Sequence, residues 1–468
     1  MLSIDITDTF LTWSGSPNGI QRTLLGLASA SNRRDDCRLC VWHRASDSWR
    51  VIPPDMFAQI FEPSGPGGMG ARPSLLDDLF RFLRTHSRMA ARGAVDAVSR
   101  SHQMTPKPEW CDVALRKPLE RFRAFRKMAR GARPDPRPAE ERLTALPRAE
   151  FGGLDDTMLF ADSHWNRRGI LRSWRQQFRR PLAVGFCYDV IPLERPDFVV
   201  EGARSIIAEW FDEMRRHSDQ IVCISDHSAR CLRATFSAET SPAPPIRSVR
   251  FGNAVEPGAE PDHGPLPLGS LLARHGQEVS HLPERAGAAC DWYLWVGSLD
   301  LRKNLDVLFL AVEGLARTGR LRRPVVVVGR RSSGYAYYRH KIERNPVLRE
   351  WLVHVEAAPD RLLHALQKQA VLMLFTSWEE GYGLPVAEAL QEGIPVIASN
   401  ATSIPEVAGD LVDYFEPWNS GQLAALIERF ESDPNYREDL TARAARFVPT
   451  SWNETIDDII SGLPQRAG

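Results

Sequence analysis

Two carboxylates on either side of a glycine turn form the most chemically suggestive stretch of this sequence. The run SWEEGYGLPVAEALQEGIPVIASN, residues 377–400, places Glu380 before Gly-Tyr-Gly and Glu388 in the helical pattern that follows. Glycines let the backbone approach a ligand, and the free N–H groups of a first helical turn can bind a diphosphate. Ionised carboxylates only accept hydrogen bonds, which suits the hydroxyl groups of sugar rings. A carboxylate, a group of N–H donors and a second carboxylate match, in that order, the hydroxylated ring, the diphosphate and the second hydroxylated ring of a nucleotide diphosphate sugar. Glu388 could instead be an acid in the first turn of a helix that interacts with the helix dipole.

A second run, WVGSLDLRKNLDVLF at residues 295–309, carries cations in a comparable setting. A strand-like segment ends at Gly297, Arg302 and Lys303 follow, and Asn304 occupies the position of an N-cap before a helical pattern. Two cations beside a helix N-terminus can bind a phosphate or pyrophosphate. Taken alone, the pair could equally be a solvated feature of a surface loop.

The elements that must position these residues are five short apolar runs, each followed by a turn or a helical pattern. Runs of this kind are typical of parallel strands covered on both faces, and they indicate a doubly wound domain. Such domains bind ligands beyond the carboxyl ends of their strands. The runs are residues 292–299, 324–330, 351–357, 370–377 and 394–400.

The N-terminal half alternates apolar runs with helical patterns and so predicts a second parallel α/β sheet. A Pro- and Gly-rich stretch at residues 259–276 is interpreted as the linker between the halves, and residues 450–463 are expected to form a helix that could pack on either domain. The predicted N-terminal strands lie within residues 2–10, 37–45, 157–165, 181–191 and 219–225, with a helix at 206–218.

Composition excludes several classes of protein. The 468 residues carry no formal net charge, which argues against a nucleic-acid partner. No apolar run approaches the roughly 20 residues that span a bilayer, and MLSIDITDTF lacks the features of a signal peptide, so a cytoplasmic protein is expected. Cys37 and Cys40 form a CxxC without a second ligand pair, and we interpret them as apolar residues of a strand rather than a zinc site.

Residues 62–148 interrupt the α/β pattern with two Pro- and Gly-rich stretches around a basic amphipathic helix. Lys and Arg outnumber the acids there by about two to one. The segment is either a solvated helix packed on the N-terminal domain or an element that lies on an anionic membrane surface.

The motifs resemble those of the retaining glycosyltransferases of family 4, the group 1 glycosyltransferases. EGYGLPVAE is similar to the E-x7-E signature of that family, and the likeness continues to residue 410. VGSLDLRKN resembles the loop for the donor phosphates, and GRRSSGY occupies the place of another glycine-bearing loop. GIQR, YDVIPLERPDF and QIVCISDHSARCL are similar to family segments of the N-terminal half, so the resemblance covers most of the chain outside residues 62–148.

The resemblance implies a GT-B fold, in which two Rossmann-like doubly wound domains face a cleft. The acceptor domain would cover residues 1–265, the donor domain 285–449, and a C-terminal helix within 450–468 could pack back on the first domain. By position, Glu388 would bind the ribose and Glu380 would face the transferred sugar, while Lys303 with Arg302 would neutralise the leaving diphosphate in place of a metal. The other donor-binding positions would be Gly381, Tyr382, Gly383, Leu384, Gly297, Ser298, Gly329 and Arg330.

Two positions depart from the family pattern. Ser298 stands where many members have an arginine, and Tyr188 precedes Asp189 where many have a histidine. Asp189 is therefore the candidate for orienting the acceptor hydroxyl, with Gly19 and Tyr188 on the acceptor side.

The expected function is retaining, metal-independent transfer of a hexose to a glycan or lipid-linked glycan in polysaccharide or O-antigen synthesis at the inner membrane face. The resemblance favours mannose from GDP-mannose, but UDP and dTDP sugars use nearly the same motifs. No cofactor besides the donor is expected. The alternatives are a sugar-nucleotide epimerase, a phosphorylase, for which no pyridoxal phosphate lysine is marked, and a protein that binds a nucleotide sugar or glycan without turnover.

Overall fold

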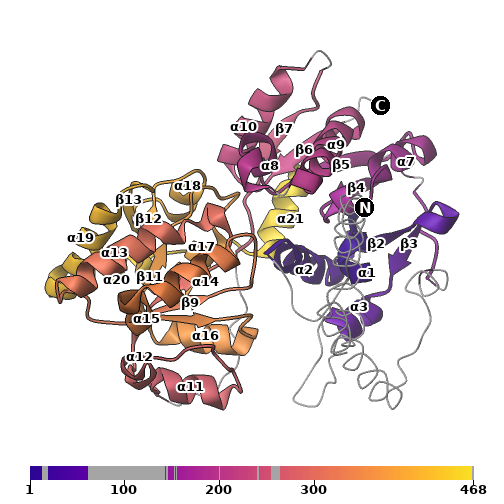
Figure 1. Cartoon of the computed structure of the whole chain (residues 1–468). Coiled ribbons are helices and arrows are strands. Elements are labelled where there is room, and N and C mark those ends of the chain that lie inside the picture. The colour runs from indigo at the N-terminus through magenta and orange to yellow at the C-terminus, as the bar shows by residue number, and fades with distance from the viewer. Residues whose placement is uncertain are drawn as a thin grey trace, which may run out of the picture.

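The structure is a computed structural model that describes residues 1–12, 19–61, 143, 146–151, 153, 155–199, 201–239, 242–253 and 264–465. Almost all of the basic segment predicted at 62–148 lies outside these residues, so both interpretations of it stay predictions. The described residues form two α/β domains, each built on its own sheet (Figure 1). No helix among them is long and apolar enough to cross a membrane.

The first domain contains a seven-stranded sheet in the order β3-β2-β1-β4-β5-β6-β7. Neighbouring strands are parallel, as predicted, except β2 and β3, which form an antiparallel pair at one edge. Strand β3 was not predicted because it is an edge strand in a tight hairpin, and β7 was not predicted because it has only three residues. The strands are β1 (Leu2–Asp5), β2 (Cys37–His43), β3 (Ser48–Ile52), β4 (Thr157–Phe160), β5 (Leu182–Cys187), β6 (Gln220–Cys223) and β7 (Ile246–Ser248).

Helices cover both faces of this sheet. The apolar face of α9 buries Trp210, Phe211 and Met214 against the strands, as its spacing of apolar residues predicts. Cys37 and Cys40 are buried in β2 as free cysteines, which fits their interpretation as apolar strand residues. The helices are α1 (Thr7–Thr12), α2 (Gly19–Asn32), α3 (Pro54–Phe61), α7 (Ile170–Gln177), α8 (Ile191–Glu194), α9 (Glu201–His217) and α10 (Asp226–Ser237).

The second domain contains a wholly parallel sheet in the order β10-β9-β8-β11-β12-β13. Leu294 and Val326 face one core while their neighbours Tyr293 and Val325 face another, so the strands are apolar on both sides as predicted. The three-residue strand β13 was missed. The strands are β8 (Trp292–Val296), β9 (Val325–Val328), β10 (Leu352–Val355), β11 (Ala370–Phe375), β12 (Val396–Ser399) and β13 (Asp413–Phe415).

The prediction of a linker at residues 259–276 was wrong in its second half. Helix α11 (Leu268–Arg274) lies there and buries Leu268, Leu271 and Leu272 in the core of the second domain. Flanking prolines and glycines obscured this short helix, so the second domain's core begins ahead of residue 285. The other helices are α12 (Glu284–Ala288), α13 (Leu305–Arg317), α14 (Tyr335–Arg344), α15 (Pro346–Trp351), α16 (Asp360–Lys368), α17 (Leu384–Gln391), α18 (Ile404–Ala408), α19 (Ser420–Ser432) and α20 (Pro434–Ala444).

The last helix, α21 (Trp452–Ser461), returns to the first domain and lies beside α2 (Figure 1). Its Trp452 ring occupies space that a side chain on Gly26 or Gly252 would fill, because a Cβ atom there would lie 2.2 and 2.4 Å from the ring. Ile456 and Ile459 are fully buried in the first domain's core. The sequence left the partner of this helix open, and these contacts place it on the first domain.

Candidate active site between the domains

The two domains enclose a cavity of about 630 Å³ at the carboxyl ends of their strands. Loops after β8, β9 and β11 form the wall of the second domain, and the loop after β5 with the start of α2 forms the opposite wall. Ile20 and Arg22, which follow the predicted Gly19 in the chain, also line the cavity. The predicted residues brought together here are Tyr188, Asp189, Gly297, Ser298, Arg302, Lys303, Gly329, Arg330, Glu380, Gly381, Tyr382, Gly383, Leu384 and Glu388.

Two glycines are required by close approaches of the backbone. A Cβ atom on Gly329 would lie 1.7 Å from the carbonyl oxygen of Gly297, so the loops after β8 and β9 are in direct contact. A Cβ atom on Gly381 would lie 2.2 Å from the carbonyl oxygen of Tyr188 and 2.9 Å from Cβ of Asp189. Gly381 therefore lets the second domain touch the loop after β5 of the first.

The turn at residues 380–383 is held by the loop that precedes α18. Ser403 Oγ donates hydrogen bonds to the carbonyl oxygens of Glu380 and Tyr382, both at 3.0 Å, and the Glu380 N–H donates to Thr402 Oγ1 at 3.0 Å. Gly383 then takes a positive φ of 103° as the residue that caps α17. Because α17 begins at Leu384, Glu388 lies beyond its first turn, and the helix-dipole interpretation of Glu388 was wrong.

A compact cluster of charges lies below this turn. Lys303 Nζ donates to Glu380 Oε1, Arg302 Nη1 lies 3.1 Å from Glu380 Oε2, and Ser377 Oγ donates to Glu380 Oε1 at 2.6 Å. Lys303 and Glu380 are only 5% and 7% exposed. Lys303 and Arg302, which were predicted to bind a diphosphate, thus pair with Glu380, which was predicted to face the transferred sugar.

Burial and pairing act in opposite directions on this cluster. Burial disfavours an ionised Glu380, but the charges of Lys303 and Arg302 outweigh it and lower the pKa of the carboxyl to about 2. Burial lowers the pKa of Lys303, and the charge of Glu380 opposes that shift. The charge of Glu380 therefore favours the ammonium form of Lys303 in a site where an isolated ammonium group would be costly.

At the other end of the cavity, Glu388 faces a residue of the first domain. Arg22 Nη1 lies 3.6 Å from Glu388 Oε1, and Arg22 also pairs with Asp360 at the start of α16. Burial raises the pKa of Glu388, Arg22 opposes the shift, and Asp360 adds to it. No role was predicted for Arg22, although the GIQR segment that contains it resembles a segment of the family.

The side chain of Tyr382 contributes to the domain interface, in addition to the backbone contact predicted for it. Its ring packs against Phe251 with 4.7 Å between ring centroids, and its hydroxyl accepts a hydrogen bond of 2.8 Å from Asn253 Nδ2. On the opposite wall of the cavity, the Tyr188 hydroxyl donates to the carbonyl oxygen of Ala161. Burial raises the pKa of Asp189, and the charge of Arg302 opposes that shift.

Two Rossmann-like domains around a shared cavity define the GT-B fold, which confirms the predicted fold class. Residues 291–447 match the family of glycosyl transferases group 1, so the chain contains a domain of that family. HepE from Anabaena, whose crystal structure was solved with UDP and glucose, has a similar fold with a TM-score of 0.54 and 14% identity, covering 99% of each chain.

Relatives by sequence match parts of the chain. Serotype-specific mannosyltransferase WbdA from Escherichia coli is 23% identical over 282 residues, which are 59% of this chain and 33% of WbdA. O-antigen chain mannosyltransferase B from E. coli is 33% identical over 170 residues, which are 36% of this chain and 44% of that protein. The chain thus spans about a third to under a half of the length of these relatives.

Proposed function

We propose that this chain transfers a hexose from a nucleotide diphosphate sugar to a hydroxyl group of a glycan or lipid-linked glycan, with retention of configuration and without a metal. The observation that carries the proposal is the single cavity in which Lys303, Arg302 and the start of α17 face Asp189 of the other domain. Cations and N–H groups on one wall suit a donor diphosphate, and the opposite wall is left for the acceptor.

The donor would lie along the second domain. Glu388 accepts hydrogen bonds from the ribose hydroxyls, the backbone of residues 381–384 approaches the diphosphate, and Glu380 accepts from hydroxyls of the transferred sugar. Lys303 and Arg302 then neutralise charge that develops on the departing phosphate. Because Glu380 pairs with both cations, binding of the donor exchanges part of that pairing for contacts with the diphosphate.

In the transfer step, the acceptor oxygen forms a bond to the anomeric carbon as the bond from that carbon to the phosphate oxygen breaks. The hydroxyl proton passes to the leaving phosphate on the same face, so no enzymic nucleophile is used. Asp189 orients the acceptor hydroxyl from the loop that contacts Gly381. Preorganised cations in a site shielded from water supply the stabilisation.

Mannose from GDP-mannose is the favoured donor because both bacterial relatives are named as mannosyltransferases. The names of these relatives also favour a role in O-antigen or related polysaccharide synthesis, and for this chain we place that role at the cytoplasmic face of the inner membrane. Each relative matches over part of its length, so donor and acceptor are tested directly.

The test is a thermal-shift screen against GDP, UDP and dTDP and their sugars, followed by transfer assays with the donor that binds. A ligand specific for the folded state raises the melting temperature by mass action. GDP and GDP-mannose should give the largest rise, and turnover should persist in EDTA with an axial product linkage by NMR. A stabilising nucleotide sugar that is never transferred or hydrolysed would instead indicate a binding protein, and no shift with any of them would refute the proposal.

A further inference from the structure

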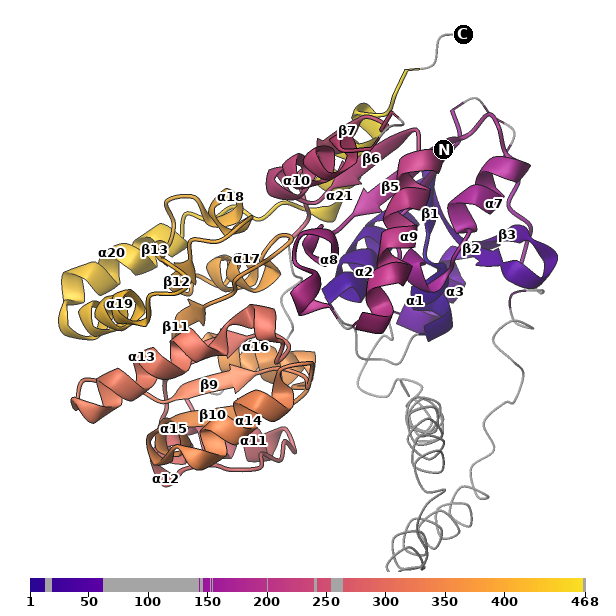
Figure 2. The ribbon, with the colours of Figure 1, turned by 45° about the horizontal axis from the view of Figure 1, so that its top comes forward.

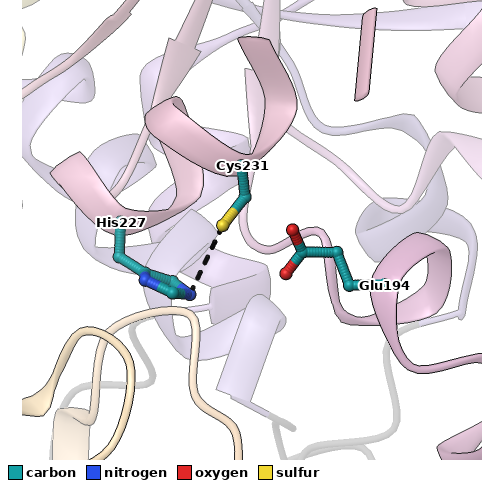
Figure 3. A group of neighbouring side chains, drawn as sticks. All are labelled: Glu194, His227 and Cys231. Carbon is teal, nitrogen blue, oxygen red and sulfur yellow. Dashed lines mark hydrogen bonds between the residues drawn. The ribbon is translucent and has the colours of Figure 1, made fainter. Parts of the chain in front are cut away.

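Three side chains with metal-binding atoms meet outside the donor cavity. Glu194 ends α8, while His227 and Cys231 lie four residues apart on α10 and therefore on one face of that helix. One ligand atom of each lies within 4.8 Å of the others. Figure 3 shows the three side chains pointing toward one another from the two helices. None of them lines the donor cavity, and the site has no role in the proposed transfer.

The geometry of the helical pair fits tetrahedral zinc. With a Zn–S bond of about 2.3 Å and a Zn–N bond of about 2.1 Å, tetrahedral ligands place sulfur and nitrogen about 3.6 Å apart. His227 Nε2 and Cys231 Sγ are 3.6 Å apart (Figure 3). Zinc could therefore enter between them without movement of α10, with the exposed Glu194 carboxylate rotating to provide a third ligand and water a fourth.

The ligand types narrow the choice of ion. Thiolate and imidazole groups select zinc and related transition metals, whereas magnesium and calcium prefer oxygen ligands alone. A carboxylate beside a thiol is unfavourable once both ionise. A divalent cation reverses this effect, since a coordinating thiol is deprotonated outright.

Charged groups from both domains surround the cluster. Glu379 of the second domain acts electrostatically on His227, and Arg195, which follows Glu194, pairs with Glu379 at 3.1 Å. Arg230, on the next turn of α10, pairs with Glu406 at 3.1 Å. Arg195 also pairs with Asp197 at 2.8 Å, so both arginines are paired with acids other than Glu194.

We infer that Glu194, His227 and Cys231 form a Zn²⁺ site, completed by water, that fastens α8 to α10. Figure 2 shows both helices on the side of the first domain that faces α17 and α18. Helix α8 directly follows Tyr188 and Asp189, and Glu379 precedes Glu380 in the donor turn. Zinc at this position would stabilise the acceptor-side loop from outside the cavity, and it takes no part in bond making.

The experiment uses the full chain, stripped of metal with a chelator and then titrated with Zn²⁺ in competition with a chromophoric chelator. One equivalent should bind, and Co²⁺ in its place should give the near-ultraviolet charge-transfer band of a cobalt thiolate. Cys231→Ser should abolish the band, and Cys231→Ser, His227→Ala and Glu194→Gln should each weaken Zn²⁺ binding by more than about 10-fold. Cys290→Ser, which alters an exposed free cysteine elsewhere, is the matched control and should leave both signals unchanged.

Melting temperatures separate ligation from folding. Zn²⁺ should raise the melting temperature of the unaltered chain and of Cys290→Ser, and it should leave that of Cys231→Ser where it is without metal. The inference is overturned if the chain binds no stoichiometric Zn²⁺, or if Cys231→Ser keeps the cobalt band and the affinity. None of these readouts depends on transferase activity, so this result and that of the donor screen are independent.

Discussion

The pairing of Lys303 with Glu380 leads to a prediction in which two partners of one ion pair have opposite effects. Lys303→Met should weaken binding of a nucleoside diphosphate such as GDP, because it removes a cation that meets the phosphates. Glu380→Gln should strengthen binding of the same diphosphate, because it removes the anion that competes for Lys303 and Arg302. GDP carries no transferred sugar, so the proposed sugar contact of Glu380 does not enter the comparison.

The magnitude follows from the burial of the cluster. Unit charges about 4 Å apart attract by about 4 kcal/mol at an effective dielectric constant of about 20, and desolvation offsets part of this. A charged hydrogen bond contributes about 1.5–3 kcal/mol net. Lys303→Met should therefore raise the Kd of GDP about 10- to 100-fold. Glu380→Gln should lower it less, about 3- to 10-fold, because the released cations also repel each other.

Isothermal titration calorimetry at fixed salt measures both Kd values. Lys341→Met is the matched control, because Lys341 pairs with Asp306 outside the cavity. Its Kd should equal that of the unaltered chain. If Lys303→Met left the Kd unchanged, or Glu380→Gln weakened GDP binding as much as Lys303→Met did, Lys303 would serve Glu380 and not the donor diphosphate.

Further changes test the rest of the site. Lys303→Ala and Glu388→Ala should each remove most transferase activity while circular dichroism shows an intact fold; full activity in either variant contradicts its assigned role. Gly381→Ala places a Cβ atom 2.2 Å from the Tyr188 carbonyl oxygen and should cut activity at least 10-fold with little loss of stability, since the strain falls on the domain contact. Burial raises the folded-state pKa of Glu388, so ionisation of this carboxyl opposes folding as the pH rises through that pKa. Glu388→Gln should therefore raise the melting temperature at pH 8 and not at pH 4. Equal changes in melting temperature at the two pH values would refute the argument. Pairing lowers the pKa of Glu380 from 4.5 to about 2, which contributes about 3 kcal/mol to the free energy of unfolding. This contribution is present above pH 4.5 and is lost as the pH falls toward 2. Glu380→Gln should therefore be less stable than the unaltered chain above pH 4.5, and urea titrations should show that difference shrinking as the pH falls toward 2.

Strand prediction succeeded where the apolar signal was long and two-sided. Runs such as 324–330 and 370–377 contain strands buried on both faces, and five of the six strands of the second domain were found this way. Most of the elements that were not predicted are short. Strands β7 and β13 have three residues each, too few to show a period, and α11 is a short helix between Pro- and Gly-rich flanks.

The site shows a similar division. The residues around the glycine turn and the Arg-Lys pair were predicted because their chemistry is concentrated in short segments beyond strand ends, where parallel sheets bind ligands. The role of Arg22 was missed, since its partners Glu388 and Asp360 are more than 300 residues away in sequence. The cluster of Glu194, His227 and Cys231 was missed because its side chains come from two different helices.

Local chemistry was therefore determined by the sequence itself: which loops carry carboxylates, cations and glycines, and which strands they follow. The tertiary structure decided what those groups face. It paired Lys303 and Arg302 with Glu380, set Gly381 against the Tyr188 backbone, and returned α21 to the first domain. Pairing, burial and pKa depend on distances between segments far apart in the chain, and residue spacing within a segment carries no information about them.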